Sequence, residues 1–321
     1  MANLEWGNKT AITEFILLGF GELPELRFLL FLLFLVIFVM TMVGNILIIV
    51  LVVIDQHLHT PMYFFLVSLS CLETCNSSNI LPRLLASFLT GDRAVTFTDC
   101  LTQYYFFGCL AATECYLLAA MSYDRYIAIC KPLHYATIMS TSLCLQLSAG
   151  VWISGFLTNT ILTGLIVNLV FCGPKEIDHF FCDAFPLMKL SCSDTHLAGL
   201  ATSTVAFVCS LPPFLLTLTS YICIIITILR IPSTRGKKKA FSTCSSHLIV
   251  VTVFYWSILT VYVLPYNDKL KDMSKVFSVF FTVLTPMINP HIYSLRNKEV
   301  KKALRQIVNL KRRELIQITL R

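Results

Sequence analysis

The sequence predicts an all-α integral membrane protein, built as a bundle of seven membrane-spanning helices. Of the 321 residues, 56% are hydrophobic and only 13% are charged, whereas soluble domains carry roughly 25% charged residues. The mean hydropathy of +0.74 indicates more apolar surface than a water-soluble core can hide. In lipid, a helix satisfies its backbone polar groups within itself, so helices are the expected elements.

Seven apolar stretches are long enough to cross a bilayer, which requires about 20 residues each. We expect the spans at residues 28–54, 61–87, 101–123, 142–170, 197–229, 241–264 and 274–293. Runs of this length with few charges do not suit a β-barrel, because barrel strands are shorter and alternate in polarity. The predicted fold is therefore one helical membrane domain with short loops.

The distribution of Lys and Arg predicts the orientation of the bundle. With the N-terminus outside, nine of the 25 basic residues fall on the outer side and sixteen on the cytoplasmic side. Cytoplasmic loops carry the excess of Lys and Arg, so this orientation is favoured. We expect an extracellular tail at 1–27, the helical domain at 28–293 and a cytoplasmic tail at 294–321. The net charge of +7 then reflects topology and attraction to anionic membrane lipid, and nucleic-acid binding is not expected.

Four of the 13 cysteines fall at the predicted outer face, where the environment is oxidising: Cys100, Cys172, Cys182 and Cys192. Two disulfides are expected there. Four cysteines allow three pairings, and their spacing does not choose among them. In the outer tail, Asn8 begins an Asn-Lys-Thr sequon, so we expect it to be glycosylated.

One face of the third predicted helix carries an ordered series of residues. Spacings of four and three place eight of them on one stripe: Cys100, Tyr104, Phe107, Ala111, Glu114, Leu118, Met121 and Arg125. At about 1.5 Å per residue, Glu114 lies roughly 21 Å from Cys100 and roughly 16 Å from Arg125, which places it near mid-membrane. The stripe therefore joins an outer cysteine, a buried acid and an inner arginine.

Glu73 and Glu114 are the only two of the 18 acidic residues deep in the predicted spans, and no Lys or Arg lies at their depth. Charged groups in the bilayer are costly and usually functional. Both acids could be protonated, they could share one proton, or they could share a cation such as Na⁺. Apart from this candidate Na⁺, no cofactor is expected.

Two motifs close predicted helices. Asp124-Arg125-Tyr126 ends the third, and Asn289-Pro290 with Tyr293 ends the seventh. Five longer stretches accompany them in order: 58-LHTPMYFFL-66, 121-MSYDRYIAIC-130, 220-SY-221, 239-KAFSTCSSHL-248 and 286-PMINPHIYSLRN-297. Together they resemble the rhodopsin-like G-protein-coupled receptors and, more narrowly, the vertebrate olfactory receptors. Ser122 and Trp256 depart from the family pattern, which commonly has alanine and glycine there. Trp256 would reshape the pocket floor or face lipid.

This resemblance implies a receptor and not an enzyme. Its expected partners are a small-molecule odorant, membrane lipid and a heterotrimeric G protein of the olfactory stimulatory type, which raises cyclic AMP. The implied location is the plasma membrane of olfactory sensory neuron cilia. The resemblance also implies the pairing Cys100–Cys182, which leaves Cys172–Cys192. The alternatives are a non-olfactory chemosensory receptor and a transporter or channel, although the sequence shows none of the paired broken helices typical of transporters.

The ligand is expected between helices three, five, six and seven, in a mostly apolar pocket of the outer half. The candidate lining residues are Tyr104, Phe107, Gly108, Ala111, Ala112, Thr202, Val205, Ala206, Cys209, Tyr255, Ile258, Leu259, Tyr262, Ser278 and Thr282. This set contains no acidic or basic side chain. It therefore favours an apolar or weakly hydrogen-bonding ligand over an amine or a carboxylic acid.

Arg125 is the expected switch at the inner end. It would pair with Asp124 at rest and turn toward Tyr221 and Tyr293 in the active state, opening a groove for a G-protein helix. The other residues expected at the coupling face are Tyr126, Lys237, Lys238, Lys239, His247, Asn289, Pro290 and Arg296. A packing role for His247 is an equal alternative. Residues 295–306 are predicted to form a short amphipathic helix on the inner leaflet.

Overall fold

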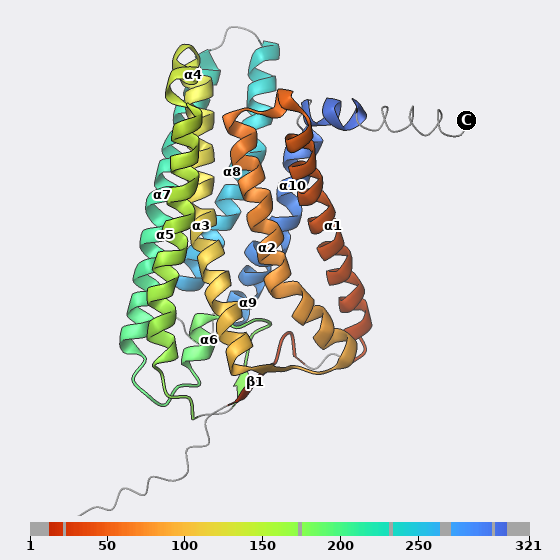
Figure 1. Ribbon diagram of the computed structural model, residues 1–321, viewed down its shortest axis with the longest axis vertical. Helices are drawn as coiled ribbons and strands as arrows, with labels where there is room; N and C mark the ends of the chain where they lie inside the picture. The colour runs from red at the N-terminus through yellow and green to blue at the C-terminus, as the bar shows by residue number, and fades with distance from the viewer. Residues whose placement is uncertain are drawn as a thin grey trace, which may run out of the picture.

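The computed structural model describes residues 13–21, 24–172, 175–230, 234–263, 271–296 and 299–306, with the side chains of 234–247, 271–272 and 293–296 left out. Long helices lie side by side along the molecule (Figure 1). They are α1 (Arg27–Ile54), α2 (Pro61–Thr90), α3 (Phe97–Cys130), α5 (Thr141–Val167), α7 (His196–Arg230) and α8 (Thr234–Tyr262), followed by α9 (Lys271–Val279) and α10 (Thr285–Arg296) around a π-helical turn, η3 (Phe280–Leu284). Short helical turns lie in the connections: η1 (Gln56–Leu58), η2 (Pro132–His134), α4 (Tyr135–Ile138) and α6 (Ala184–Met188).

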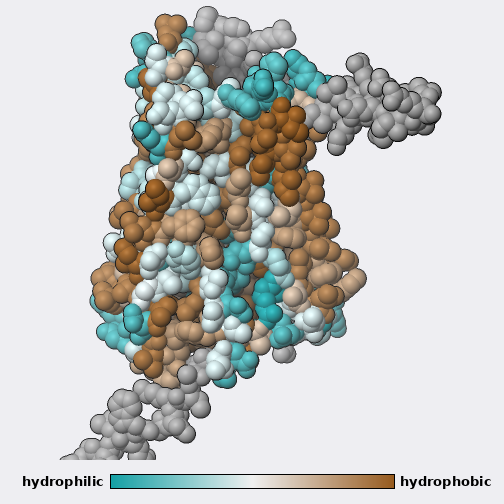
Figure 2. All heavy atoms as spheres, viewed as in Figure 1, coloured by the Kyte–Doolittle hydropathy of each residue, from teal (hydrophilic) through white to brown (hydrophobic). Residues whose placement is uncertain are grey.

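Each of the first six predicted spans overlaps one long helix, whereas the seventh, 274–293, overlaps α9, η3 and α10 in succession. Among the described residues, α1, α3, α5 and α7 are long and apolar enough to cross a membrane, and Leu248–Tyr262 of α8 is a shorter apolar segment. Figure 2 shows hydrophobic side chains over much of the α1 side of the molecule. Large exposed side chains there include Phe28, Val43 and Val53. An apolar surface of this extent suits contact with lipid.

The contact between α1 and α10 follows from a proline and a glycine. Pro290 has no backbone N–H, so the carbonyl of Pro286 lacks its helical partner. The side-chain amide of Asn45 on α1 donates to this carbonyl over 3.2 Å. Gly44 provides the space, because a Cβ there would lie 3.0 Å from Cγ of Pro290. The carbonyl left without a helical partner by Pro290 thus receives a hydrogen bond from α1.

A small sheet at one end of the bundle was not predicted by the all-α assignment. Strand β1 (Glu14–Leu17) pairs antiparallel with β2 (Ala94–Thr96) and parallel with β3 (Glu176–Ile177). The side chains of β1 alternate, with Phe15 and Leu17 buried. Strands of two to four residues are too short for a hydropathy scan to detect, and the sheet forms only because three distant segments meet. The segment expected as an outer tail therefore covers this end of the bundle.

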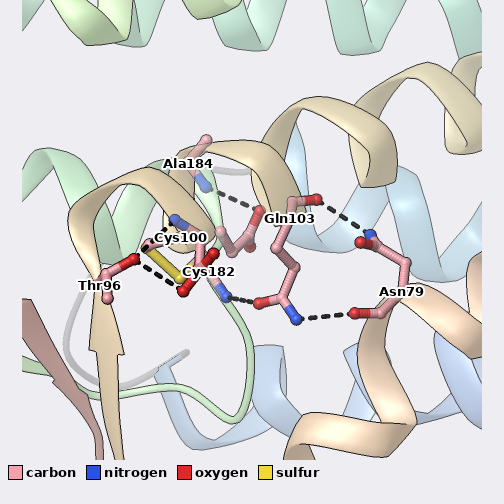
Figure 3. Close-up of a disulfide and its surroundings, with 8 residues drawn as sticks. Asn79, Thr96, Cys100, Gln103, Cys182 and Ala184 are labelled. Carbon is pink, nitrogen blue, oxygen red and sulfur yellow. Dashed lines mark hydrogen bonds between the residues drawn. A yellow bond between two sulfur atoms is a disulfide. The ribbon is translucent and has the colours of Figure 1, made fainter.

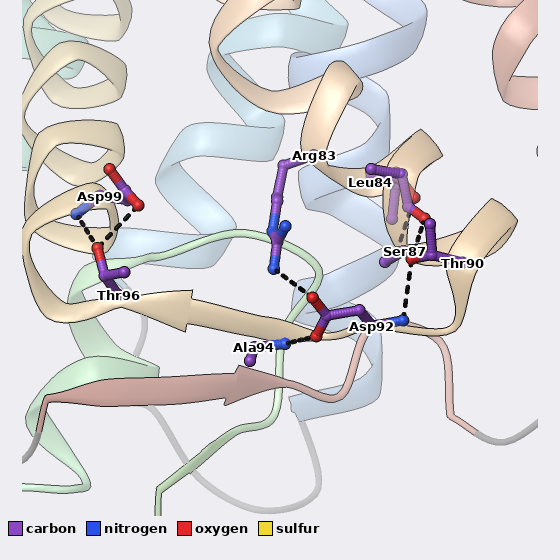
Figure 4. A network of polar contacts seen from close by, with 9 residues as sticks. Arg83, Leu84, Ser87, Thr90, Asp92, Ala94, Thr96 and Asp99 are labelled. Carbon is purple, nitrogen blue, oxygen red and sulfur yellow. Dashed lines mark hydrogen bonds and ion pairs between the residues drawn. The ribbon is translucent and has the colours of Figure 1, made fainter.

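The connection from α2 to α3 is held by its own polar groups (Figure 4). Gly91 ends α2 with a φ of +82°, a left-handed conformation that favours glycine. Asp92 accepts a backbone N–H two residues along the chain over 2.9 Å and lies 4.0 Å from the guanidinium of Arg83. Thr96 caps α3 by accepting the backbone N–H of Asp99 over 3.1 Å. These bonds fix the start of the helix that carries the stripe.

Residues 299–306 are helical and extend sideways from the bundle (Figure 1). Val300 and Ala303 are buried in a cluster with apolar residues of α1, η1 and α2. The opposite face carries the exposed residues Lys301, Lys302 and Arg305. Residues 299–306 thus pack apolar side chains against the bundle and expose basic ones.

Candidate functional site

A cavity of about 80 Å³ lies between α3, α5, α7, α8 and the loop that carries α6. Its wall includes eleven of the fifteen residues expected from the sequence: Tyr104, Phe107, Gly108, Ala111, Ala112, Thr202, Val205, Ala206, Cys209, Ile258 and Tyr262. These side chains are mostly apolar and small. The apolar character of this wall suits a small organic molecule held chiefly by apolar contact.

Four expected residues do not line this cavity. Tyr255 is fully buried and donates its hydroxyl to the backbone carbonyl of Cys115. Ser278 and Thr282 are buried in the α9–η3 segment, where the Thr282 hydroxyl donates to the carbonyl of Ser278 over 2.6 Å. Leu259 is half-buried on α8. The seventh span, expected to contribute to the wall, contributes no described residue to this cavity, whereas α5 contributes Asn159 and Leu162.

Five lining residues were absent from the sequence-based set: Cys115, Asn159, Leu162, Asp183 and Ala184. The most consequential is Asp183, since no acidic side chain was expected. Its Oδ1 accepts the hydroxyl of Tyr262 over 2.7 Å and the backbone N–H of Ala184 over 2.8 Å. Burial raises the pKa of Asp183 to about 6. Its position next to Cys182 could have indicated that Asp183 lines the cavity, because the disulfide from Cys182 to α3 places this part of the loop over the bundle.

That disulfide joins Cys100 to Cys182 with a Cα–Cα distance of 5.4 Å (Figure 3). Beside it, Gln103 accepts the backbone N–H of Cys182 over 2.8 Å and donates to the carbonyl of Asn79 over 3.0 Å. The Asn79 amide returns a bond to the carbonyl of Gln103 over 3.0 Å. The second pair, Cys172–Cys192, closes the loop itself. The loop is thereby fixed to α3, and the same part of α3 is bonded to α2.

The same loop also contacts α9. Lys275 forms an ion pair with Asp178. The next residue, His179, is buried, and its ring stacks on Phe180 with centroids 4.7 Å apart. Burial and the charge of Lys275 lower the pKa of His179 to about 3. The imidazole is therefore neutral at physiological pH.

Glu73 and Glu114 are both buried, and their carboxyl groups interact with each other. Asn289 donates to Oε1 of Glu73. Several buried oxygens have no hydrogen-bond partner among the described residues: Oε2 of Glu73, Oδ1 of Asn76, Oγ of Ser77, Oε1 of Glu114 and Oδ1 of Asn289. Such a group of oxygen donors suits a hard cation or shared protons. The structure therefore brings the two predicted acids together.

Toward the end of α3 away from the Cys100 disulfide, Arg125 donates to Oδ2 of Asp124 from Nη2 over 2.6 Å and from Nε over 3.2 Å. The hydroxyl of Tyr135 donates to Oδ1 of the same carboxylate over 2.8 Å. Asp124 is buried, whereas Arg125 is half-buried. Tyr126 packs against the apolar cluster that contains the buried Tyr221. Asp124 is therefore bonded to both Arg125 and Tyr135.

Part of the expected coupling face lies outside the described side chains: Lys237, Lys238, Lys239, His247, Tyr293 and Arg296. Asn8 lies outside the described residues altogether. Of the two departures from the family pattern, Trp256 is 61% exposed on α8 and so does not form the pocket floor. Ser122 is buried and donates to the carbonyl of Leu118 over 2.8 Å.

Comparison with known proteins agrees with the motifs. The family profile described as "Olfactory receptor" matches residues 34–311. The chain is 48% identical to olfactory receptor 5AP2 of Mus musculus over 302 residues, which cover 94% of this chain and 95% of that receptor. It is 46% identical to olfactory receptor 11A1 of Homo sapiens over 310 residues, 97% of this chain and 98% of that receptor. It is 48% identical to olfactory receptor 6B1 of Homo sapiens over 304 residues, 95% of this chain and 97% of that receptor.

Proposed function

Because the chain belongs to the olfactory receptor family, it is an odorant-sensing G-protein-coupled receptor, and we propose that the cavity beneath the outer loop is its odorant site. The observation that carries this proposal is the wall of the cavity, which gathers small and apolar residues from four helices. The ligand is small and mostly apolar. Asp183 adds one buried carboxylate to the wall, but Tyr262 and Ala184 already donate to its Oδ1.

Activation is proposed to shift the bundle between two packings. In the described state, Asp124 holds Arg125 at the inner end. Release of Arg125 toward Tyr221 would open the coupling face to a stimulatory G protein of the olfactory type, which raises cyclic AMP. Leu133, 92% exposed beside this site, offers an apolar side chain for a partner to cover.

Glu73 and Glu114 are proposed to hold either a Na⁺ ion or a shared proton. The unpartnered oxygens around them support a ligand of this kind, because a buried polar atom without a partner is costly. A bound Na⁺ would neutralise the two carboxylates in the membrane interior. Asn289 would orient Glu73 in either case.

We further propose seven spans, with the extracellular tail at 1–27, the receptor domain at 28–293 and the cytoplasmic tail at 294–321. The protein would lie in the plasma membrane of olfactory cilia, with Asn8 glycosylated outside. Lys301, Lys302 and Arg305 would face anionic lipid of the inner leaflet.

The test is expression of the full chain with an olfactory-type stimulatory G protein, a cyclic AMP reporter and a broad odorant panel. We expect a concentration-dependent response to at least one small, weakly polar odorant. Arg125→Ala should abolish the response while surface display persists. Silence of the displayed receptor across the panel, or normal signalling by Arg125→Ala, would contradict the proposal.

A further inference from the structure

Asn159 is a polar side chain set into the otherwise apolar α5 wall of the cavity. It is only 6% exposed and it lines the cavity from α5. Its Nδ2 donates to the carbonyl of Gly155, one turn earlier, over 3.1 Å. This bond fixes the orientation of the amide, because the reverse orientation would oppose two oxygens. Among the described residues, no donor reaches its Oδ1.

The amide oxygen occupies a position that only glycine on α3 permits. A Cβ at Gly108 would lie 2.2 Å from Oδ1 of Asn159 and 2.9 Å from its Cγ, but 3.6 Å from Nδ2. The oxygen therefore faces Gly108, and any other residue at 108 would displace it. Since Gly108 also lines the cavity, the oxygen sits at the lining of the ligand space.

A second glycine fixes the distance between the two helices. A Cβ at Gly155 would lie 2.3 Å from Oγ1 of Thr113 and 2.7 Å from the carbonyl oxygen of Cys109. Thus Thr113 of α3 packs against Gly155 of α5, and Asn159 of α5 packs against Gly108 of α3. This reciprocal packing leaves Asn159 little freedom to move away from the cavity.

We propose that Asn159, positioned by Gly108, determines the ligand class of the pocket: small neutral molecules that carry a hydroxyl group. The inference rests on the proposed function. A hydroxyl supplies the hydrogen that Oδ1 lacks, and it accepts from the second Nδ2–H. The rest of the wall is chiefly apolar, and Oδ1 of Asp183 is already bonded. A ligand without a donor would bury Oδ1 unpaired, which costs more than losing a contact.

The experiment uses the full receptor, the cyclic AMP reporter and matched probes: straight-chain primary alcohols, their methyl ethers and the corresponding primary amines. Wild type should respond at lower concentration to the alcohol than to its ether. Asn159→Leu, similar in size, should raise the half-maximal concentration for the alcohol roughly 3- to 10-fold and lower that for the ether, because no unpaired Oδ1 is left to bury. Gly108→Ala should change the same ratio, because it displaces the amide.

Ala206→Val is the matched control, since it narrows the same cavity from α7, whereas Asn159 lies on α5. It should shift the alcohol and the ether equally. Asn159→Leu carries the test if Gly108→Ala is not displayed at the surface. An alcohol-to-ether ratio unchanged by Asn159→Leu, or a preference for the amine, overturns the inference. A receptor that responds to other odorants but to none of the alcohols also overturns the inference, but it does not contradict the proposed function. Only silence toward every odorant would contradict the function itself.

Discussion

Two glycines of α5 should respond in opposite directions to the same substitution. Gly155 faces α3, where an added Cβ would meet Oγ1 of Thr113 at 2.3 Å and a backbone oxygen at 2.7 Å. Gly150 lies on the same helix and would meet nothing within 4 Å. Gly155→Ala must therefore separate α3 from α5 or distort one of them, whereas Gly150→Ala only adds a methyl group at the surface.

The magnitudes follow from these surroundings. Alanine in place of glycine stabilises a helix by about 1 kcal/mol, and this gain applies at both positions. Overpacking in a closely packed interior costs about 1–3 kcal/mol, and this cost applies only at Gly155. The free energies of unfolding of the two variants should therefore differ by about 1–3 kcal/mol, with Gly150→Ala the more stable.

The assay is thermal unfolding of the purified receptor in detergent, with wild type and both variants measured side by side. Gly150→Ala should unfold at or slightly above the temperature of wild type, and Gly155→Ala below it. Combining Gly155→Ala with Thr113→Ala should recover part of the loss, because only the backbone contact remains. Equal stability of the two single variants would refute the close approach of α3 and α5.

Three further predictions concern the ends of the bundle. Cys100→Ser removes a disulfide that spans 82 residues, and Cys172→Ser removes one that spans 20. The longer loop gains more entropy in the unfolded chain, so Cys100→Ser should lower the free energy of unfolding by about 1 kcal/mol more, as measured by thermal unfolding. Tyr135→Phe removes a hydrogen bond from the carboxylate that holds the switch arginine, so ligand-independent cyclic AMP should rise roughly 2- to 10-fold at equal surface display. Burial raises the pKa of Asp183 to about 6, so the stability that Asp183 contributes falls as pH rises from about 4 to 6. Burial lowers the pKa of His179 to about 3, so the stability that His179 contributes falls as pH drops below about 6.5. Asp183→Asn should therefore leave a receptor that loses stability on acidification, and His179→Gln one that gains it; parallel pH profiles of unfolding temperature would exclude this assignment.

Hydropathy was sufficient to locate the long helices, because lipid imposes length and apolarity on each span independently of its neighbours. It could not locate β1, whose pairing depends on segments about 80 and 160 residues away along the chain. Most of the cavity wall on α3 and α7 was predictable, since helical periodicity shows which residues share a face. Asp183 and Asn159 could not be predicted as lining residues. The position of Asp183 depends on the path of a loop, and that of Asn159 depends on Gly108 of a different helix.

The third helix connects the candidate ligand site to the candidate switch through its interior face. Cys115 lines the cavity, and its backbone carbonyl accepts the hydroxyl of Tyr255 on α8. The preceding residue, Glu114, faces Glu73, and Arg125 lies eleven residues further along α3. A ligand can shift the equilibrium only through contacts that differ between the two packings. The bond between Tyr255 and Cys115 joins the wall of the cavity to α8, the helix that carries the expected coupling residues Lys237, Lys238 and Lys239. A ligand that displaced α3 at Cys115 would strain the hydrogen bond between Tyr255 and Cys115. Movement of α8 would then accompany the separation of Arg125 from Asp124.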